Sequence, residues 1–187
     1  MPIFMSEYDE KYAILQVAKL MVVSARTAPK SGGRDDILIA VVTRAEKMLL
    51  ATEMIKIGEE RNASYFIDNA DSVRDSEALV LIGVRGTRSF GLNCGACGYA
   101  SCDDFNKTIK KKTGQDFSGA NCNFKVLDLG IALGSAVKTA SLLNTDNRIM
   151  YTIGTAAKKL KMLPEASIIM GIPLSAKGKN IYVDRES

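Results

Sequence analysis

The four cysteines of this 187-residue chain all lie in one stretch, residues 93–122, and this stretch constrains the fold more than any other feature. The cysteines are Cys94, Cys97, Cys102 and Cys122, with the spacing C-x2-C-x4-C-x19-C. A CxxC pair turns tightly enough for two thiolates to reach one metal centre. Gly95 and Gly98 favour such a turn, because glycine adopts positive φ without strain. The stretch therefore predicts a metal centre with thiolate ligands.

Several cofactors are compatible with four thiolates. A short loop that supplies three cysteines, followed by a distant fourth, is the ligand set of a [4Fe–4S] cluster. A structural zinc site and two disulfides are the alternatives. Zinc ribbons bring two CxxC knuckles, whereas this chain has one. Disulfides require an oxidising compartment, of which the sequence gives no sign. The spacing thus favours a cluster over zinc, and zinc over disulfides.

The cysteine segment resembles the four-cysteine 4Fe–4S domain found in corrinoid iron–sulfur proteins and in the ion-translocating electron-transport complex. The resemblance rests on the opening CGACGYASC and on Phe105 shortly after it. The loop before Cys122 is a few residues longer here, and Asn123 stands where that family usually has proline. The resemblance implies a 4Fe–4S cluster on the four cysteines.

The amino-acid composition argues against several kinds of site and partner. Histidine is absent, which excludes histidine metal sites and catalytic triads that use imidazole. The 25 basic residues exceed the 21 acidic ones without forming a concentrated patch, so no nucleic-acid partner is expected. No apolar run approaches the ~18 residues of a membrane span, and the N-terminus lacks the pattern of a signal peptide. We therefore expect a cytoplasmic protein with no membrane partner.

Outside the cysteines, apolar patterns predict a mixture of helices and strands. Helices are expected at 6–25, 44–60, 103–112, 124–143 and 155–163, and strands at 37–42, 78–84 and 166–171. A polar turn or a short helix is expected at 71–76. Ser6 is predicted to cap the first helix, and Thr43 to Glu46 read as a capping box. The first helix is apolar nearly all round, which predicts that it is buried.

The lysine run at 110–112 has two interpretations. Three cations at the end of the helix expected at 103–112 complement the negative end of its dipole. The same charges would also suit the docking of an acidic redox partner protein beside the cluster. Charge runs are usually solvated surface, so the structural interpretation is favoured.

The loop after the first helix carries groups suited to an anion or a polar cofactor ring. Ser31, Gly32 and Gly33 offer backbone N–H groups with little obstruction, and Arg26 and Arg34 bracket them. The tail adds further cations that could hold a phosphate, namely Lys177, Lys179 and Arg185. An ordinary exit from a helix into a loop is the alternative interpretation.

These loop residues belong to a wider resemblance, to the FMN-dependent nitroreductase fold. It rests on the loop ARTAPKSGG at 25–33, the glycine-containing helix at 128–143, and Gly171-Ile172-Pro173 ahead of the basic tail. The Arg-x-Ser-x-Arg phosphate clamp that opens nitroreductases has no counterpart before Ala13. The whole chain is most similar to a family of uncharacterised proteins that contain a ferredoxin domain.

The resemblance implies an α+β fold, a nitroreductase-like sheet flanked by helices with a small iron–sulfur module inserted in it. Residues 1–85 and 123–187 would form the core, and 86–122 the module. The resemblance also implies a homodimer with FMN bound at the interface by the loop and tail residues named above. FAD is not expected, because no GxGxxG motif follows a strand.

Three functional hypotheses follow. In the first, the protein is an oxidoreductase in which the cluster relays single electrons to a flavin, which then reduces a small substrate. In the second, it is an electron carrier or redox-responsive protein with a cluster and no flavin, as the missing arginine clamp suggests. The third, a zinc-stapled interaction protein, is the least favoured.

Overall fold

The computed structural model describes residues 5–108 and 112–183. Its main sheet contains antiparallel strands in the order β1–β2–β6–β5. These strands are β1 (Ile37–Val42), β2 (Ala78–Val84), β5 (Asp146–Asn147) and β6 (Ile168–Ser175). The strand β2 is buried along its whole length because it lies between β1 and β6 and is covered on both faces. The α+β class predicted from the sequence is confirmed.

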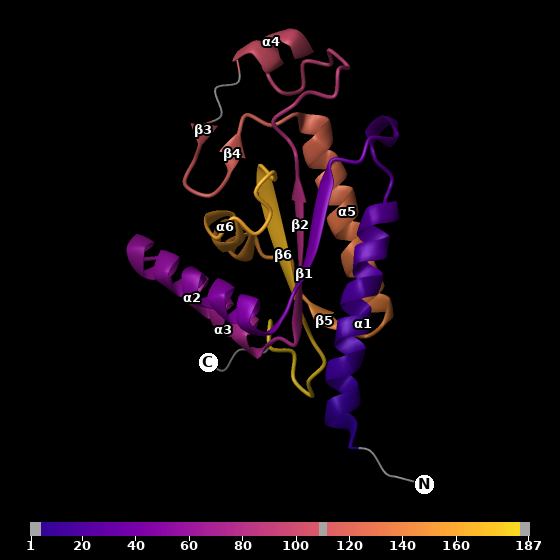
Figure 1. Cartoon of the computed structure of the whole chain (residues 1–187), viewed down its shortest axis with the longest axis vertical. Helices are drawn as coiled ribbons and strands as arrows, with labels where there is room; N and C mark the ends of the chain where they lie inside the picture. The colour runs from indigo at the N-terminus through magenta and orange to yellow at the C-terminus, as the bar shows by residue number, and fades with distance from the viewer. Residues whose placement is uncertain (1–4, 109–111, 184–187) are drawn as a thin grey trace.

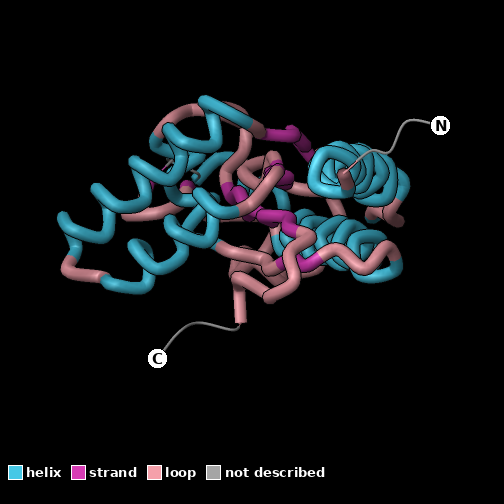
Figure 2. The backbone as a smooth tube through the Cα atoms, turned by 90° about the horizontal axis from the view of Figure 1, so that it is seen from below, coloured by secondary structure: helices cyan, strands magenta, loops and turns pink. Residues whose placement is uncertain are grey.

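Helices cover both faces of this sheet (Figures 1 and 2). On one face lie α1 (Ser6–Thr27) and α5 (Asn123–Leu142), and on the other α2 (Arg44–Arg61), α3 (Ser64–Asp75) and α6 (Tyr151–Lys159). Each face has its own apolar core. Side chains alternate between the two cores along β1: Ile39 and Val41 face the α1 side, whereas Leu38 and Ala40 face the α2 side.

The first helix is less buried than its composition predicts. In α1, the residues that pack into the core are Ile14, Val17, Ala18, Met21 and Ala25. Leu20 and Val23 are 49% and 57% exposed, so the prediction of a helix buried nearly all round is wrong for a single chain. The predicted caps also differ. The residue before α1 is Met5, and neither Met5 nor Thr43 makes a side-chain capping hydrogen bond.

Four other elements differ from expectation. The helix α3 begins at Ser64, where only a turn or short helix near 71–76 was expected. Of the helix expected at 103–112, the structure describes α4 (Cys102–Thr108), and Lys112 begins the strand β3 (Lys112–Thr113), which pairs with β4 (Ser118–Gly119). Lys110 and Lys111 lie outside the described residues. The helix α6 begins four residues earlier than predicted, and β6 extends to Ser175.

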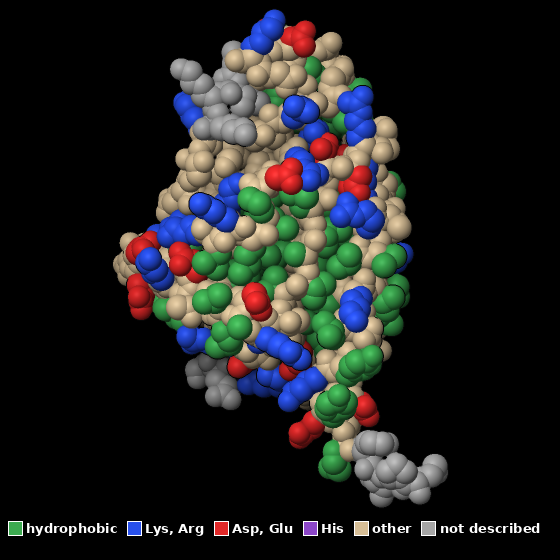
Figure 3. Space-filling model, in the orientation of Figure 1, with side chains coloured by type: hydrophobic (Ala, Val, Ile, Leu, Met, Phe, Trp, Pro, Cys, Tyr) green, Lys and Arg blue, Asp and Glu red, His purple; other side chains and the backbone are tan. Residues whose placement is uncertain are grey.

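The surface is apolar in the middle of one face. Figure 3 shows hydrophobic side chains gathered there, over the position that β1 occupies in Figure 1. Among the helices of 5–108 and 112–183, none has both the length and the apolar character needed to cross a membrane.

Candidate metal centre

The cysteine segment leaves the sheet after β2, projects from one end of the molecule, and returns at the start of α5 (Figure 1). Its two ends lie side by side, because the N–H of Cys122 donates to the carbonyl of Gly86 (2.8 Å). Gly86 in turn donates its N–H to Oγ of Ser167 (2.9 Å). A Cβ on Gly86 would lie 2.1 Å from Oδ1 of Asn121 and 2.7 Å from Oγ of Ser167, so glycine lets these side chains pack closely at the crossing point.

Asn93 organises the loop around Cys102. Its Oδ1 accepts a hydrogen bond from the N–H of Cys102 (2.8 Å), and its own N–H donates to the Cys102 sulfur (3.3 Å). That N–H is the largest of the effects that lower the pKa of the Cys102 thiol below its ordinary value. Asn93 was not among the predicted site residues. Its place directly before Cys94 is the signal that could have identified it.

All four cysteines line one small cavity at the outer end of the segment. All four are free thiols, from the exposed Cys94 to the buried Cys122, so the disulfide alternative is not observed. The cavity volume is about 10 Å³, which is room for about one water molecule. The remaining lining residues are Ser89, Phe90, Leu92, Gly95, Tyr99, Ser101, Asn123 and Phe124.

A single metal ion needs its ligands close together. Tetrahedral zinc, with Zn–S bonds of about 2.3 Å, would place its four sulfurs within about 3.8 Å of one another. Across 5–108 and 112–183, no three cysteine, aspartate or glutamate side chains are grouped so that they could hold a metal ion. A [4Fe–4S] cluster attaches each thiolate to a different iron, so its ligands stand further apart.

A cluster would need more room than this cavity has, and the loop above the cavity faces solvent. Residues 91–101 are mostly exposed, and a Cβ on Gly91 or Gly98 would meet nothing within 4 Å. Below the loop, the fully buried Phe105 of α4 packs edge-on against Tyr99, with ring centroids 5.3 Å apart. An exposed loop on a packed base, with thiolates as its soft ligands, fits an iron–sulfur cluster.

The predicted flavin loop is held in place by α5. The N–H and Oγ of Ser31 both donate to Oδ1 of Asp128, at 2.9 and 2.8 Å. Asp128 is only 4% exposed, so these bonds form away from competing water. Asp128 was not predicted as a site residue, although a carboxylate among the apolar residues of a helix signals a specific partner.

The same loop lies directly against the cysteine segment. A Cβ on Gly32 would be 2.5 Å from the ring of Phe90, and the φ of Gly32 is +54°, so this close contact favours glycine. Arg34 donates to the carbonyl of Phe90 (3.1 Å), and its guanidinium lies 5.1 Å from the centre of the Phe90 ring. Phe90 also lines the cysteine cavity. One aromatic ring therefore separates the predicted flavin loop from the predicted cluster.

Arg26 already has protein partners. Its guanidinium forms an ion pair with Asp35 and donates to the carbonyl of Ile37 (2.9 Å). These bonds join the end of α1 to the start of β1. A phosphate at Arg26 would compete with both, so this side chain serves first to hold the loop.

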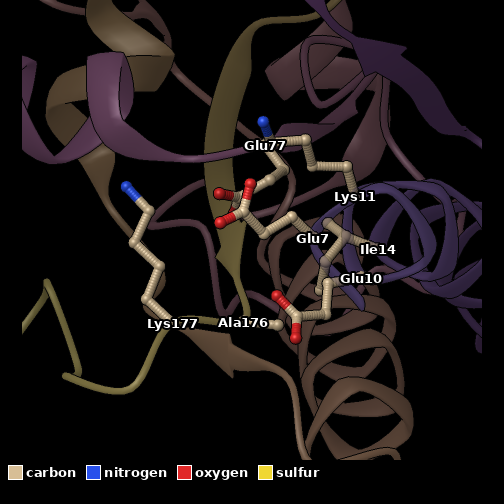
Figure 4. A pocket seen from close by; sticks show the side chains of 7 residues that line it. All are labelled: Glu7, Glu10, Lys11, Ile14, Glu77, Ala176 and Lys177. Atoms are coloured by element: carbon tan, nitrogen blue, oxygen red, sulfur yellow. The ribbon is translucent and has the colours of Figure 1, made fainter. Parts of the chain in front are cut away.

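The predicted phosphate-binding lysines lie elsewhere. Lys177 follows β6 and donates to the carbonyl of Asp75 (2.7 Å). It lines a cavity of about 260 Å³ with residues from the first turns of α1 (Figure 4). That end of α1 is about 33 Å from the end that carries Arg26, at 1.5 Å per residue over the 22 residues of the helix. Lys179 follows two residues later, and Arg185 lies outside the described residues.

The cavity beside Lys177 is poorly suited to a phosphate. Three carboxylates line it, from Glu7, Glu10 and Glu77, together with Lys11 (Figure 4). Acidic side chains repel an anion at this range. A single chain thus brings together Arg26, residues 31–33 and Arg34, but it does not bring the lysines to them.

Two family models match the chain. The model described as "Uncharacterized protein containing a ferredoxin domain" matches residues 118–185, and the model "Putative Fe-S cluster" matches residues 91–114. An uncharacterized protein of Archaeoglobus fulgidus is 50% identical over 182 residues, which cover 97% of each chain.

Solved nitroreductases share the fold. An FMN-bound nitroreductase of Desulfitobacterium hafniense superposes with a TM-score of 0.55 at 13% identity, over 88% of this chain and 78% of that one. An FMN-bound nitroreductase of Bacteroides fragilis gives 0.54 at 10% identity, over 92% and 82%. Nitroreductase A of Vibrio parahaemolyticus gives 0.52 at 12% identity, and the match covers 88% of this chain but only 59% of that protein. The predicted nitroreductase-like fold is confirmed.

Proposed function

This chain belongs to the family of uncharacterized proteins that contain a ferredoxin domain, and we propose that it is an iron–sulfur oxidoreductase that passes single electrons from a 4Fe–4S cluster to a flavin. The four cysteines would hold the cluster, and the loop at 31–34 would contact the flavin. When bound, a cluster supplies one-electron transfer and a flavin can hand on electrons as a pair. A small substrate would be the final acceptor.

The contact through Phe90 is the observation that carries this proposal. The loop expected to meet the flavin and the cavity lined by the cysteines share this one side chain. Asp128 fixes Ser31, and Arg34 fixes Phe90, so both sides of the contact are held by hydrogen bonds. A flavin and a cluster held on either side of the Phe90 ring would exchange electrons with little structural rearrangement.

We further propose that residues 86–122 are a module inserted between the core segments 1–85 and 123–187. The hydrogen bond between Cys122 and Gly86 supports it, because it closes the module where it meets the sheet. Thiolate ligands require a reducing compartment, so the proposal includes a cytoplasmic location. An acidic redox partner would meet the exposed basic residues that the structure describes in the module, Arg88, Lys107 and Lys112, the last of which belongs to the lysine run.

The flavin proposal also requires a second copy of the chain. In one chain the loop at 31–34 and the lysines at 177 and 179 lie at opposite ends of α1. In a homodimer, the loop of one copy could meet the lysine end of the other. The outer face of α1 and α5 is suited to such a contact, because it exposes Leu20, Val23, Leu127 and Ile131.

We predict that this outer face makes the protein a homodimer burying well over ~2,000 Å², the size of obligate interfaces. Light scattering should give the mass of two 20.2 kDa chains at low micromolar concentration. Ile131→Glu should shift the protein to monomer, because a charge would be buried without a partner. Leu49→Glu, on the exposed side of α2, is the control and should leave the mass unchanged. A monomeric wild type would refute the prediction.

A cluster-only electron carrier is the second candidate. It is favoured by the engagement of Arg26 with Asp35 and by the carboxylates around Lys177, which leave one chain without an assembled phosphate site. Absorption spectra of protein purified without oxygen distinguish the candidates. Flavin gives structured bands, and a cluster gives a broad brown shoulder.

We predict that FMN binds to protein with an intact cluster. Its fluorescence should be quenched on titration at tens of micromolar protein. Arg34→Gln should weaken binding at least about tenfold, since it removes both a charge and the contact that holds Phe90. Arg85→Gln, which loses only the exposed pair with Glu165, should bind FMN as the wild type does. Absence of quenching in the wild type would favour the carrier.

A further inference from the structure

We infer that the free edge of β1 is a self-pairing surface, through which two copies of the chain join their sheets in antiparallel fashion. This contact is separate from the outer face of α1 and α5. Figures 1 and 2 show β1 at one margin of the sheet, on a different side of the molecule from α5. Nothing in the proposed redox function depends on it.

The backbone of β1 leaves specific groups free. Asp36 accepts a hydrogen bond from Arg85, so even-numbered residues of β1 direct their N–H and C=O groups toward β2. The odd-numbered residues direct theirs outward. At Ile37 these groups are satisfied within the chain, by Asp35 and by Arg26. In the described part of the chain, the outward groups of Ile39 and Val41 have no partner strand.

The free backbone groups of one β1 strand are complementary to those of β1 in a second copy. If two β1 strands lie antiparallel with Ala40 opposite Ala40 of a second copy, then Ile39 lies opposite Val41 of that copy, and the reverse. Each such pair exchanges both of its hydrogen bonds. The alternative registers, centred on Ile39 or on Val41, would leave free groups facing Ile37 or Thr43. Only the register centred on Ala40 joins every free group to another, and it places the smallest side chain at the close central pair.

The side chains support the same register. Beside the edge, on its α2 side, lies a groove of about 230 Å³. Its lining residues are Ala40, Val41, Val42, Thr43, Glu46, Leu81 and Met162. In the register centred on Ala40, Leu38 of the second copy lies opposite Val42 and would fill this groove. The half-buried Leu38 would thereby become buried in both copies. Arg44 of the second copy would also approach Asp36.

The edge lacks the usual protection against pairing. Exposed edge strands are normally interrupted by proline, by a bulge or by inward-pointing charge. The strand β1 has the sequence ILIAVV and none of these features. At the position that β1 occupies in Figure 1, Figure 3 shows hydrophobic side chains on the surface. Because one strand pair buries less than a standard interface of ~1,600 Å², we expect association that depends on concentration, giving the dimer a route to a tetramer.

Disulfide trapping tests the register. Ala40→Cys would place two thiols across a close antiparallel pair, with Cα atoms about 4.5 Å apart, which is within disulfide range. Mild oxidation should therefore link most of this variant into covalent dimers. Wild type and Thr52→Cys, whose new thiol would lie on exposed α2, are the controls for the native cysteines. Cross-linking of the Ala40 variant no faster than these controls would overturn the inference.

A proline variant tests the hydrogen bonds without relying on new thiols. The N–H of Ile39 points away from β2, so Ile39→Pro removes no hydrogen bond within the chain. It should keep the far-UV spectrum and abolish association beyond the dimer, whereas Ile39→Val should retain that association. In the wild type, raising the protein concentration should slow amide hydrogen exchange at Ile39 and Val41 roughly tenfold or more. Exchange at these amides that is independent of concentration would contradict the pairing.

Discussion

Replacing Cys97 or Cys102 with serine should remove most of the iron and acid-labile sulfide from the protein while leaving the main sheet folded. A serine hydroxyl does not replace a thiolate as a ligand to iron, and the remaining cysteines cannot complete the set. The two apolar cores contain no residue of the module, so their packing does not depend on the cluster. Hydrogen exchange should therefore rise across 86–122 and stay unchanged in α1 and α5.

The matched control is Thr113→Ser, in the same module but outside the residues that line the cysteine cavity. It should retain both iron and sulfide. Iron and sulfide assays, with far-UV circular dichroism on the same samples, measure the two parts of the prediction separately. Stoichiometric zinc without sulfide in wild-type protein prepared anaerobically would show that the cysteines hold zinc instead.

The elements predicted well from the sequence are those whose pattern is local. The buried strands β1 and β2 are continuous apolar runs, and their bounds match the expectation. The helix α3 was missed over its first half because its apolar positions are sparse: only Phe66, Ala70 and Val73 reach the core. The short strands β3, β4 and β5 have two residues each, too few for an apolar pattern to reveal them. The strands β3 and β4 pair with each other across a short turn, whereas β5 forms only because it meets the distant β6.

In the candidate site, too, the features predicted from the sequence are those with a local pattern. The cysteine spacing is local, and it identified a cavity that all four thiols do line. The contact between Gly32 and Phe90 joins residues 58 positions apart, and that between Ser31 and Asp128 joins residues 97 apart, so only tertiary packing reveals them. The separation of Lys177 from the loop is likewise a consequence of the length of α1. The sequence identifies the side chains that could form the site, but it does not show which of them come together in the folded chain.

Gly154→Ala should be among the most destabilising substitutions in the chain. A Cβ at this position of α6 would lie 1.7 Å from the carbonyl oxygen of Ile169, a backbone atom of β6 that cannot move aside cheaply. From the other side, a Cβ on Gly171 would meet the side chain of Ile153 at 2.1 Å. The two glycines thus let α6 lie against β6. Alanine at 154 would force α6 away from β6 and open the core between Ile153 and Ile169.

We expect a loss of about 3 kcal/mol in the free energy of unfolding, the upper range for overpacking a core. For a chain of this length that corresponds to a fall in Tm of about 6–12 °C. Urea unfolding followed by circular dichroism measures it, and a loss below about 1 kcal/mol would show that α6 can shift without cost.

Alanine substitutions at the glycines of α5 serve as the comparison for Gly154→Ala. Gly130 and Gly134 are also inside a helix, but a Cβ on either would meet nothing within 4 Å in the described part of the chain. In a lone chain, alanine at either position should therefore stabilise the helix by up to about 1 kcal/mol. If these glycines instead admit a second copy across the outer face of α1 and α5, Gly134→Ala should weaken the dimer while leaving the monomer more stable. Unfolding and light scattering on the same variant separate the two effects, and a variant that is more stable and equally dimeric would place the interface elsewhere.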